Sequence, residues 1–556
     1  MSERRAGCMS LSGENGYAPD PASVAGKAPP IHAQTDLLVI GAGPAGIAAA
    51  LAAAEHGVQV TLVDEHPVPL RTMGEEVPLH FGGRMAASLA NRNAVLESVL
   101  QSHPQLAEAS DAGIDVRLGT AVWGLFPQRP TTQWLTGHVA GLADEEQAYL
   151  LRFKQVIVAA GRRDMGLAFE GWQLPGVMGA SAAYQLACTY EGLQARTAVL
   201  LGSSDEALLI GNALQDAGVQ IAAIVEQADA AVGATHLLER LSSRGARLFT
   251  SHVVQQALGD ADGVAAVRLA RVDADGRRVA EQFVSLDCDA LLLGVAAIPA
   301  IELLEASGCA VRFESARGGH VPALDAAQRT SIPFIYAVGD CAGIWSRKSQ
   351  ATAIAAREGV IAGRAAVRAL GAPIAPSPAD APVVPDTPAR DIAAERVAWV
   401  RAAVLHAPSD QMICQCEEVS AAEILTLRPP RYLGWGKDLG RHGSAVSAPP
   451  GPHPDVVKRL TRAGMGACQG RRCREQITAL LALGAGCALD ALPLATYRVP
   501  VRPLRLDQLA GLPEVPAMAE HWDSWFGMAS QWVPFWRAAG EYTAAARSSN
   551  EPVASE

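Results

Sequence analysis

Two features are missing from this sequence: a run of about 18 apolar residues and, at its N-terminus, the apolar centre of a secretory signal. We therefore expect no transmembrane segment and a cytoplasmic location. An excess of positive charge is also missing, because the formal charge is −11 and the pI is about 5.7. This balance argues against nucleic acid and anionic lipid as partners.

The chain does have length, small residues and cysteine. Its 556 residues exceed a single hydrophobic core and predict three or four domains. The abundance of alanine and glycine is typical of α/β proteins with closely packed helices. Ten cysteines without an export signal favour metal or redox chemistry over structural disulfides. Four of them are scattered and predict no redox-active disulfide: Cys188, Cys288, Cys309 and Cys341.

Residues 36–64 carry a dinucleotide-binding fingerprint. The segment DLLVIGAGPAGIAAALAAAEHGVQVTLVD predicts a strand, a glycine turn, an alanine-rich helix and a second strand that ends on an acid. The glycines allow a tight turn, close approach to a pyrophosphate and close helix–strand packing, while the acid accepts hydrogen bonds from a ribose. The residues expected around this cofactor are Gly41, Gly43, Pro44, Ala45, Gly46, Asp64 and Glu65.

Two later segments indicate that the nucleotide is a flavin, FAD. VIVAAGRR (156–163) reads as a strand entering a glycine turn, and TSIPFIYAVGDCAG (330–343) delivers an aspartate at the end of an apolar strand. They are similar to the ATG and TxxxxhhAhGD segments of flavoproteins with two dinucleotide-binding domains. In those proteins the aspartate binds the ribityl and phosphate side of FAD, and the next helix presents N–H groups to the flavin. The similarity adds Ala160, Gly161, Gly339, Asp340 and Ala351 to the expected site.

A second strand–helix–strand pattern, at 197–227, has a damaged glycine turn. The turn reads GSSDEA, so two of the three glycine positions are lost. Asp205 and Glu206 put negative charge in the first helical turn, where it repels a pyrophosphate. A retained scaffold domain is therefore favoured, and NAD(P) binding stays open. The candidate residues for NAD(P) are Gly202, Ser204 and Glu226.

Four cysteines in the C-terminal third form two close pairs. They stand as Cys414-x-Cys416 and, after 51 residues, as Cys468-x4-Cys473. Four thiolates suit a [2Fe–2S] cluster or Zn²⁺. Zinc knuckles usually place about two to four residues between their cysteines, so the C-x-C pair favours iron–sulfur over zinc or free thiols.

The residues around the second cysteine pair suggest how a cluster would be tuned. Backbone N–H groups near Gly466 and Gly470 would be available to the cluster sulfurs. Three arginines, Arg471, Arg472 and Arg474, either offset the negative charge of the cluster or form solvated surface.

The segment CQCEEV…TRAGMGACQGRRC resembles bacterioferritin-associated ferredoxin in the form that is fused to flavoproteins. With AFEGWQLPGVMGASAA (168–183) and the flavin motifs, it makes residues 35–500 similar to the larger subunits of hydrogen cyanide synthase, opine oxidase and dye-linked proline or hydroxyproline dehydrogenases. The alpha subunit of heterotetrameric sarcosine oxidase is also similar. The sequence departs from these proteins in two loops: HPVPLRTMGEEVPLHFGGRM replaces a PxPGGQ loop, and RPPRYLGWGKDLGRHGSAVSAPPGPHP separates the cysteine pairs.

The resemblance implies an electron-transfer subunit of an amine or amino-acid dehydrogenase or oxidase of the opine, glycine, proline or hydroxyproline type. A smaller, FAD-dependent partner of the glycine/D-amino-acid oxidase type would take hydride from a C–N bond. Electrons would then pass through the cluster of this chain toward its flavin or an external acceptor. In some relatives the first slot holds an adenine nucleotide other than FAD. Two other hypotheses are a stand-alone NAD(P)H-dependent flavin/iron–sulfur reductase and a non-enzymatic cluster-bearing sensor or scaffold.

We therefore expect an α/β fold with two Rossmann-like dinucleotide-binding domains, of the glutathione-reductase or thioredoxin-reductase type, and a small, mainly helical [2Fe–2S] domain. The expected segments are a disordered lead at 1–34, an FAD-binding domain at 35–165 and 296–370, a second nucleotide-binding-like domain at 166–295, a Pro/Ala-rich linker at 371–394, the cluster domain at 395–500 and an aromatic tail at 501–556. The tail's tryptophans form either a strap on the chain's own core or a docking surface. They are Trp522, Trp525, Trp532 and Trp536.

Overall fold

The computed structural model describes residues 30–68, 92–129, 132, 135–386, 390–428 and 453–512. The tryptophans of the tail, most of the expected lead and most of both unusual loops lie outside the described residues. The first strand begins at Ala33, so the last residues of the segment expected to be a lead belong to a sheet.

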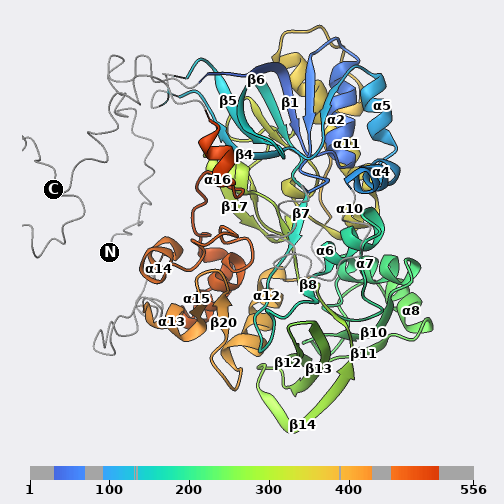
Figure 1. Cartoon of the computed structure of the whole chain (residues 1–556), viewed down its shortest axis with the longest axis vertical. Coiled ribbons are helices and arrows are strands. Elements are labelled where there is room, and N and C mark those ends of the chain that lie inside the picture. Colours follow the sequence, from blue (N-terminus) through green and yellow to red (C-terminus); the bar gives the residue numbers. More distant parts are fainter. Residues whose placement is uncertain are drawn as a thin grey trace, which may run out of the picture.

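The first dinucleotide-binding domain is built on a seven-stranded sheet, drawn at the top of Figure 1. Its order is β3-β2-β1-β6-β5-β4, and β19 also pairs with β6. The strands are β1 (Ala33–Ile40), β2 (Val60–Val63), β3 (Asp115–Arg117), β4 (Ala121–Phe126), β5 (His138–Ala143), β6 (Ala148–Val158) and β19 (Ile335–Ala337). β1, β2, β3, β6 and β19 pair in parallel, while β4 and β5 form an antiparallel extension.

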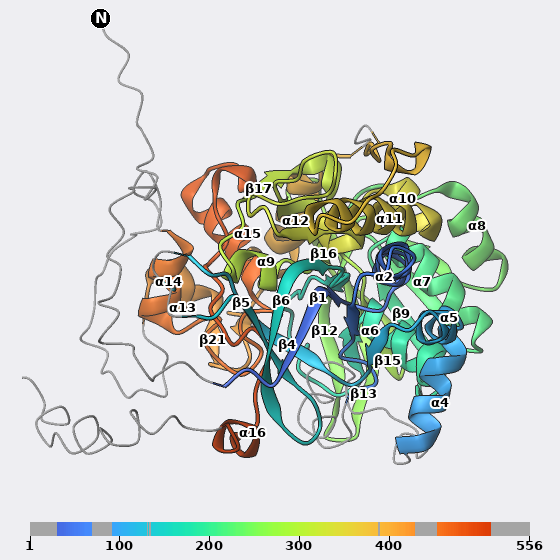
Figure 2. The ribbon, with the colours of Figure 1, turned by 90° about the horizontal axis from the view of Figure 1, so that it is seen from above.

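Two helices from opposite ends of this domain pack together against its sheet, as both ribbon views show (Figures 1 and 2). α2 (Pro44–Ala54) follows the fingerprint turn, and α11 (Thr352–Ala369) follows the second flavin segment. Their backbones nearly touch, because a Cβ at Gly359 would lie 2.0 Å from the carbonyl oxygen of Ala45. α5 (Gln105–Asp111) packs against α2, and α4 (Arg92–Ser102) packs with its Val95 and Val99 against the second domain.

The second domain has a five-stranded parallel sheet in the order β11-β10-β9-β15-β8. Its strands are β8 (Val177–Gly179), β9 (Thr197–Leu201), β10 (Gln220–Val225), β11 (Arg247–Phe249) and β15 (Ala290–Leu293). Its helical segments are α6 (Ala180–Tyr184), η3 (Gln185–Thr189), α7 (Asp205–Asp216) and α8 (Thr235–Ser243). The same domain also contains a separate antiparallel sheet of β12 (His252–Asp260), β13 (Gly263–Val272) and β14 (Arg278–Asp287).

The chain passes between these domains through two strands that pair with each other. β7 (Arg162–Asp164) leads out of the first domain, and β16 (Ala297–Pro299) leads back in an antiparallel pairing. The return segment holds α9 (Glu302–Ala306), β17 (Val311–Glu314), η4 (Ser315–Arg317), β18 (Gly319–Pro322), η5 (Gly339–Ala342) and α10 (Ser346–Gln350).

The C-terminal part is small and mainly helical, and it lies beside both nucleotide-binding domains (Figure 1). It contains α12 (Ile392–Val400), η7 (Arg401–Leu405), β20 (Met412–Cys414), β21 (Val419–Ser420), α13 (Ala421–Thr426), α14 (Pro454–Thr461), α15 (Arg474–Ala485), η10 (Leu489–Ala491) and α16 (Leu506–Ala510). In the Pro/Ala-rich segment before it, η6 (Pro378–Asp380) pairs with α11 through Asp380. The helices expected after each cysteine pair are α13 and α15.

One hydrophobic cluster joins the C-terminal part to the second domain. It includes Val199 and Leu291 of the five-stranded sheet together with Trp399, Ile413 and Leu480, each at most 3% exposed. The C-terminal part is therefore packed on the nucleotide-binding body through a shared core. The expected fold class, two dinucleotide-binding domains plus a small helical part, is confirmed.

Candidate dinucleotide and cysteine sites

The first glycine turn leaves open the place where a pyrophosphate would lie. A Cβ at Gly41 would meet the carbonyl oxygen of Ala159 at 2.2 Å, and one at Gly46 would meet the carbonyl oxygen of Gly41 at 1.8 Å. These glycines permit close backbone packing. At Gly43, by contrast, no described residue beyond its two chain neighbours comes within 4 Å of the position that a Cβ would occupy. Pro44 and Ala45 then open α2, whose first N–H groups point out of the turn.

The acids after β2 are already bonded to protein. Asp64 accepts hydrogen bonds from the N–H of Ala42 at 2.6 Å and of His66 at 2.8 Å. Each carboxylate oxygen keeps a second acceptor site for a ribose hydroxyl. Glu65 instead forms an ion pair of 2.6 Å with Arg502 near the end of the described chain. Asp64 thus fixes the turn, and Glu65 anchors the C-terminal segment.

A buried ion pair, which the sequence did not reveal, holds the second flavin segment. Lys348 is fully buried and contacts Glu358 at 2.8 Å. Its Nζ donates to the carbonyls of Gly339 and Gly343 at 2.6 and 2.8 Å, and Glu358 accepts from the N–H of Gly339 at 2.8 Å. Burial raises the pKa of Glu358. The turn around Asp340 is therefore held from its buried side by this ion pair.

Around Asp340 itself the structure presents side chains and backbone suited to binding a cofactor. Asp340 lies 3.5 Å from Arg162, whose Nη1 is buried without a hydrogen-bond partner among the described residues. Gly161 has open space at its Cβ position, and Ala351 stands at the junction of α10 and α11. The open Gly43 and the orphaned Arg162 donor fit a dinucleotide, which Asp64, Asp340 and the α2 N-terminus would hold.

The second glycine turn is filled by the chain itself. Ser204, at the position that corresponds to Gly43, is 6% exposed and caps α7 by accepting from the N–H of Ala207. Gly202 keeps the left-handed conformation of Gly41. Glu226, at the ribose position, is buried and accepts from the N–H and hydroxyl of Ser203 at 3.1 and 2.7 Å. Burial raises the pKa of Glu226.

The loop 229–234 covers the start of α7. The N–H of Val232 donates to Ser203 Oγ at 3.0 Å, and the N–H of Ala234 donates to Asp205 Oδ1 at 2.7 Å. A Cβ at Gly233 would lie only 2.5 Å from the carbonyl oxygen of Ser203 and 3.0 Å from the nitrogen of Asp205. Backbone of this loop therefore lies directly against the start of α7.

The two cysteine pairs come together across the C-terminal part. The thiols of Cys414 and Cys473 share a hydrogen bond, as do those of Cys416 and Cys468. In the described part of the chain no three His, Cys, Asp or Glu side chains are arranged to hold a single metal ion. The thiols meet instead as two pairs, and the hydrogen bond from Cys416 lowers the pKa of Cys468.

Backbone N–H groups are directed at the sulfurs. Cys414 Sγ accepts from the N–H of Gly464 at 3.4 Å, and Cys468 accepts from the N–H groups of Gly470 and Arg472. α15 begins directly after Cys473, so its positive end faces the thiols. Convergent thiols with backbone donors fit a thiolate-bound [2Fe–2S] cluster held by the four cysteines.

The three arginines of the second cysteine loop are not solvated surface, so that alternative is wrong. Arg471 and Arg474 are 8% and 4% exposed. Arg471 Nε donates to the carbonyl of Cys468, and Arg474 pairs with Glu305 at 2.7 Å. Arg472 lies 4.9 Å from the centroid of the buried Trp172 ring.

A hydrogen-bonded network connects the two candidate sites. Arg163 on β7 pairs with Glu302 at 2.8 Å and with Glu475 of α15 at 2.6 Å. Its Nη1 also donates to the carbonyl of Arg471, inside the second cysteine loop, at 2.9 Å. Its neighbour Arg162 faces Asp340. Adjacent residues of one short strand thus contact Asp340, in the second flavin segment, and the cysteine loop.

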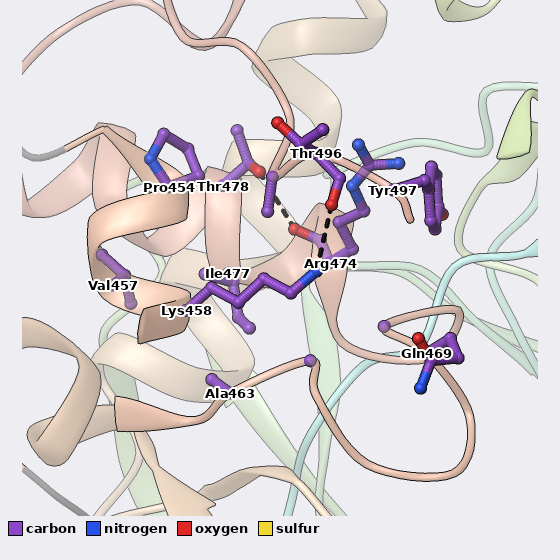
Figure 3. Close-up of a pocket in the computed structure, with 13 residues that line it drawn as sticks. Pro454, Val457, Lys458, Ala463, Gln469, Arg474, Ile477, Thr478, Thr496 and Tyr497 are labelled. Carbon is purple, nitrogen blue, oxygen red and sulfur yellow. Dashed lines mark hydrogen bonds between the residues drawn. The ribbon is translucent and has the colours of Figure 1, made fainter. Parts of the chain in front are cut away.

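A small cavity adjoins the cysteine loop between α14 and α15 (Figure 3). Its volume is about 20 Å³, room for a single water. Lys458 crosses it and donates to the carbonyl of Thr496 at 3.0 Å, and Gly464 forms the wall nearest Cys473. This cavity is too small for an organic substrate.

The family model of pyridine nucleotide-disulphide oxidoreductases matches residues 35–359. The chain is 29% identical over 502 residues to the A subunit of opine oxidase from Agrobacterium tumefaciens strain Ach5, covering 86% of this chain and 92% of that protein. It is 27% identical over 473 residues to the HcnB subunit of hydrogen cyanide synthase from Pseudomonas protegens, covering 78% and 89%. L-proline dehydrogenase from P. horikoshii shares the fold, with a TM-score of 0.55, 19% identity, and coverage of 86% and 79%.

The resemblance to opine oxidase and hydrogen cyanide synthase subunits is confirmed by these matches. No helix in the described ranges has the length and apolar character needed to cross a membrane. The family match supports binding of FAD, NAD(P) or both. Because that match spans more than half of its residues, the chain belongs to the pyridine nucleotide-disulphide oxidoreductase family and is an oxidoreductase.

Proposed function

We propose that this chain is the electron-transfer subunit of a multi-subunit amine or amino-acid dehydrogenase or oxidase. It would carry FAD in the first dinucleotide site and a [2Fe–2S] cluster on Cys414, Cys416, Cys468 and Cys473. The cofactors would supply the redox chemistry, and the protein would set their spacing and potential.

The observation that carries this proposal is the direct connection between the two sites. Arg162 and Arg163 contact Asp340 and the carbonyl of Arg471 from neighbouring positions on β7. The cysteine loop is thus fixed next to the exit of the flavin segment. Such an arrangement suits the passage of electrons between two carriers in one chain.

Substrate oxidation would take place mainly on a partner. Both relatives described above are named as subunits, and one is a subunit of opine oxidase. We infer a smaller, FAD-dependent partner of the amine-oxidase type, which removes hydride from a C–N bond of an opine, glycine, proline or hydroxyproline type of substrate. This chain would receive the electrons and pass them to an acceptor, working in the cytoplasm.

A stand-alone NAD(P)H-dependent reductase is disfavoured by the second domain. Such an enzyme needs the turn at Gly202 and Ser204 to accept a pyrophosphate. Ser204 is committed to the cap of α7, and loop 229–234 lies over the helix start. Anaerobic addition of NADH or NADPH should therefore leave the flavin spectrum unchanged, while rapid bleaching would favour the reductase.

The cofactor assignment is tested by counting iron, acid-labile sulfide and flavin in the anaerobically purified protein, together with EPR after reduction. We expect two irons and two sulfides per chain, as the cluster formula requires, and one flavin. A zinc-containing, EPR-silent protein without sulfide would exclude the cluster, and absence of a reducible flavin would favour a sensor or scaffold.

The relay assignment needs a second experiment. The chain should be expressed alone and together with an amine-oxidase-type flavoprotein partner from the same source. We expect amino-acid-dependent reduction of an artificial acceptor only with both chains present. Complete oxidation of an amino acid by the single chain would show that the substrate site lies here.

A further inference from the structure

Trp172 lies at the contact between the nucleotide-binding body and both cysteine loops. Its ring is 1% exposed. The indole Nε1 donates to the carbonyl of Met412, two residues before Cys414, at 2.8 Å. The face of the same ring lies 4.9 Å from the guanidinium carbon of Arg472, next to Cys473. One side chain from outside the C-terminal part therefore contacts the loop of each cysteine pair.

Arg472 directly precedes Cys473, and its backbone N–H donates to the sulfur of Cys468. Its guanidinium stacks on the Trp172 ring beside these cysteines. Lys458, which lines the cavity next to Gly464, is a second cation on the side of Cys473. Arg474 is directed away, to Glu305 and to the ring of Tyr497. The Arg471 Nε is bonded to the carbonyl of Cys468.

The backbone that carries Arg472 is held against the segment before Trp172. A Cβ at Gly166 would lie 2.2 Å from the carbonyl oxygen of Arg472, so the two segments are in contact there. Gln476, one turn into α15, accepts from the N–H of Ala168 at 3.1 Å. The position of Arg472 is thus set by residues 166–172, outside the cysteine domain.

We propose that Arg472 is a counter-charge of the cysteine site and that Trp172 is the positioning residue that holds its guanidinium beside the two cysteine loops. This inference rests on the proposed [2Fe–2S] site. Reduction adds one electron to a cluster whose four thiolates are already negative, so a fixed cation stabilises the reduced form more than the oxidised form. Arg472 would therefore raise the reduction potential of the cluster.

The test is an EPR-monitored redox titration of the full-length protein, with dithionite as the reductant. We expect Arg472→Gln to shift the midpoint potential to more negative values and Arg472→Lys to restore part of the shift. Trp172→Phe keeps a ring but loses the Nε1 hydrogen bond, so it should give a smaller shift of the same sign. Arg459→Gln removes the same charge from the exposed face of α14 and serves as the matched control.

The outcomes separate this inference from the proposed function. Iron and sulfide in the wild type, with equal potentials in the wild type, Arg472→Gln and Trp172→Phe, would overturn the inference alone. An equal shift in Arg459→Gln would also overturn it, because the effect would then depend on net charge rather than on position. Wild-type protein without iron and sulfide would overturn the proposed function and this inference together. If Arg472→Gln does not retain iron, Trp172→Phe and Arg472→Lys decide the sign of the shift.

Discussion

The guanidinium of Arg163 donates a hydrogen bond of 2.9 Å to the main-chain carbonyl of Arg471. Arg163 stands two residues after Gly161 of the flavin segment, and Arg471 lies between Cys468 and Cys473. The same guanidinium pairs with two carboxylates, Glu302 and Glu475. A single side chain thus connects the strand that follows the flavin segment to the backbone of the cysteine loop.

Replacing Arg163 with methionine should destabilise the protein strongly. Glu302 and Glu475 would stay buried without their partner, which costs about 3–5 kcal/mol of unfolding free energy. Chemical denaturation measures this loss. Arg240→Met removes an arginine from a pair that is 54% and 52% exposed, and should change stability by less than about 0.5 kcal/mol. Equal losses of stability from the two substitutions would contradict the conclusion that the buried Arg163 network stabilises the fold.

Gly43→Ala should impair cofactor binding without impairing folding. Gly43 has an extended backbone that alanine can adopt, and its Cβ position is open, so the methyl group would occupy the space of the pyrophosphate. We expect the dissociation constant for FAD to rise roughly tenfold or more, which corresponds to about 1.4 kcal/mol of binding free energy. Titration of the flavin-free protein with FAD measures this constant, and flavin absorbance of the purified protein shows the resulting loss of bound flavin.

The matched control for Gly43→Ala lies in the second domain. Ser204→Ala changes the corresponding turn position, where the side chain caps α7. This variant should lose about 1 kcal/mol of stability and keep its flavin. If Ser204→Ala lost flavin as fully as Gly43→Ala, the assignment of the cofactor to the first site would be wrong.

The double variant Asp205→Ala/Glu206→Ala should not gain NADH binding. It removes the negative charges at the start of α7, but the backbone of loop 229–234 still covers that helix end. Anaerobic titration with NADH, followed by flavin absorbance, distinguishes repulsion by the two carboxylates from coverage by the loop. Tight binding by the double variant would mean that charge alone had closed the site.

Lys348→Met should loosen the turn that presents Asp340. The substitution leaves Glu358 buried without its cation, at a cost of about 3–5 kcal/mol, and removes two hydrogen bonds from the turn. Adding Glu358→Gln removes the unpaired charge while an amide oxygen still accepts from Gly339. The double variant should therefore recover part of the stability, as measured by thermal unfolding, and failure to recover any would argue against a coupled pair.

Asp164 should make stability fall as pH rises through the weakly acidic range. Burial raises the pKa of Asp164 from 3.8 to about 6. Between these values the folded protein keeps a proton that the unfolded chain loses, so stability decreases with rising pH by up to about 3 kcal/mol. Asp164→Asn does not titrate and should lack this decrease. Urea unfolding at several pH values from 4 to 7 makes the comparison, and parallel curves would contradict it.

The sequence predicted what local patterns determine. The strand–glycine–helix pattern around Gly41 and the second strand before Asp64 have the expected forms. β10 also ends next to Glu226 as expected. These elements follow from hydrophobic runs and glycine spacing within about thirty residues, which a single sequence displays directly.

The sequence did not predict contacts between distant segments. Nothing near Trp172 indicates that its indole reaches Met412, and Lys348 stands in a polar stretch that reads as surface. The charge at Asp205 suggested repulsion, but the backbone around Gly233 is what fills the turn. The Pro/Ala-rich segment suggested a separate module, whereas one hydrophobic cluster spans both sides of it. Such contacts depend on tertiary packing, which leaves no periodic signal in the sequence.

The close contact of α11 with α2 has a consequence for when the first site can be completed during synthesis. The carbonyl of Ala45 lies against Gly359, so the glycine turn at the beginning of the chain is completed by a helix made much later. During synthesis the second domain leaves the ribosome between these two pieces, and domains tend to fold as they emerge. We therefore expect the proposed dinucleotide to be retained in the first site only after α11 is released, so that a ribosome stalled before that helix carries a chain without it.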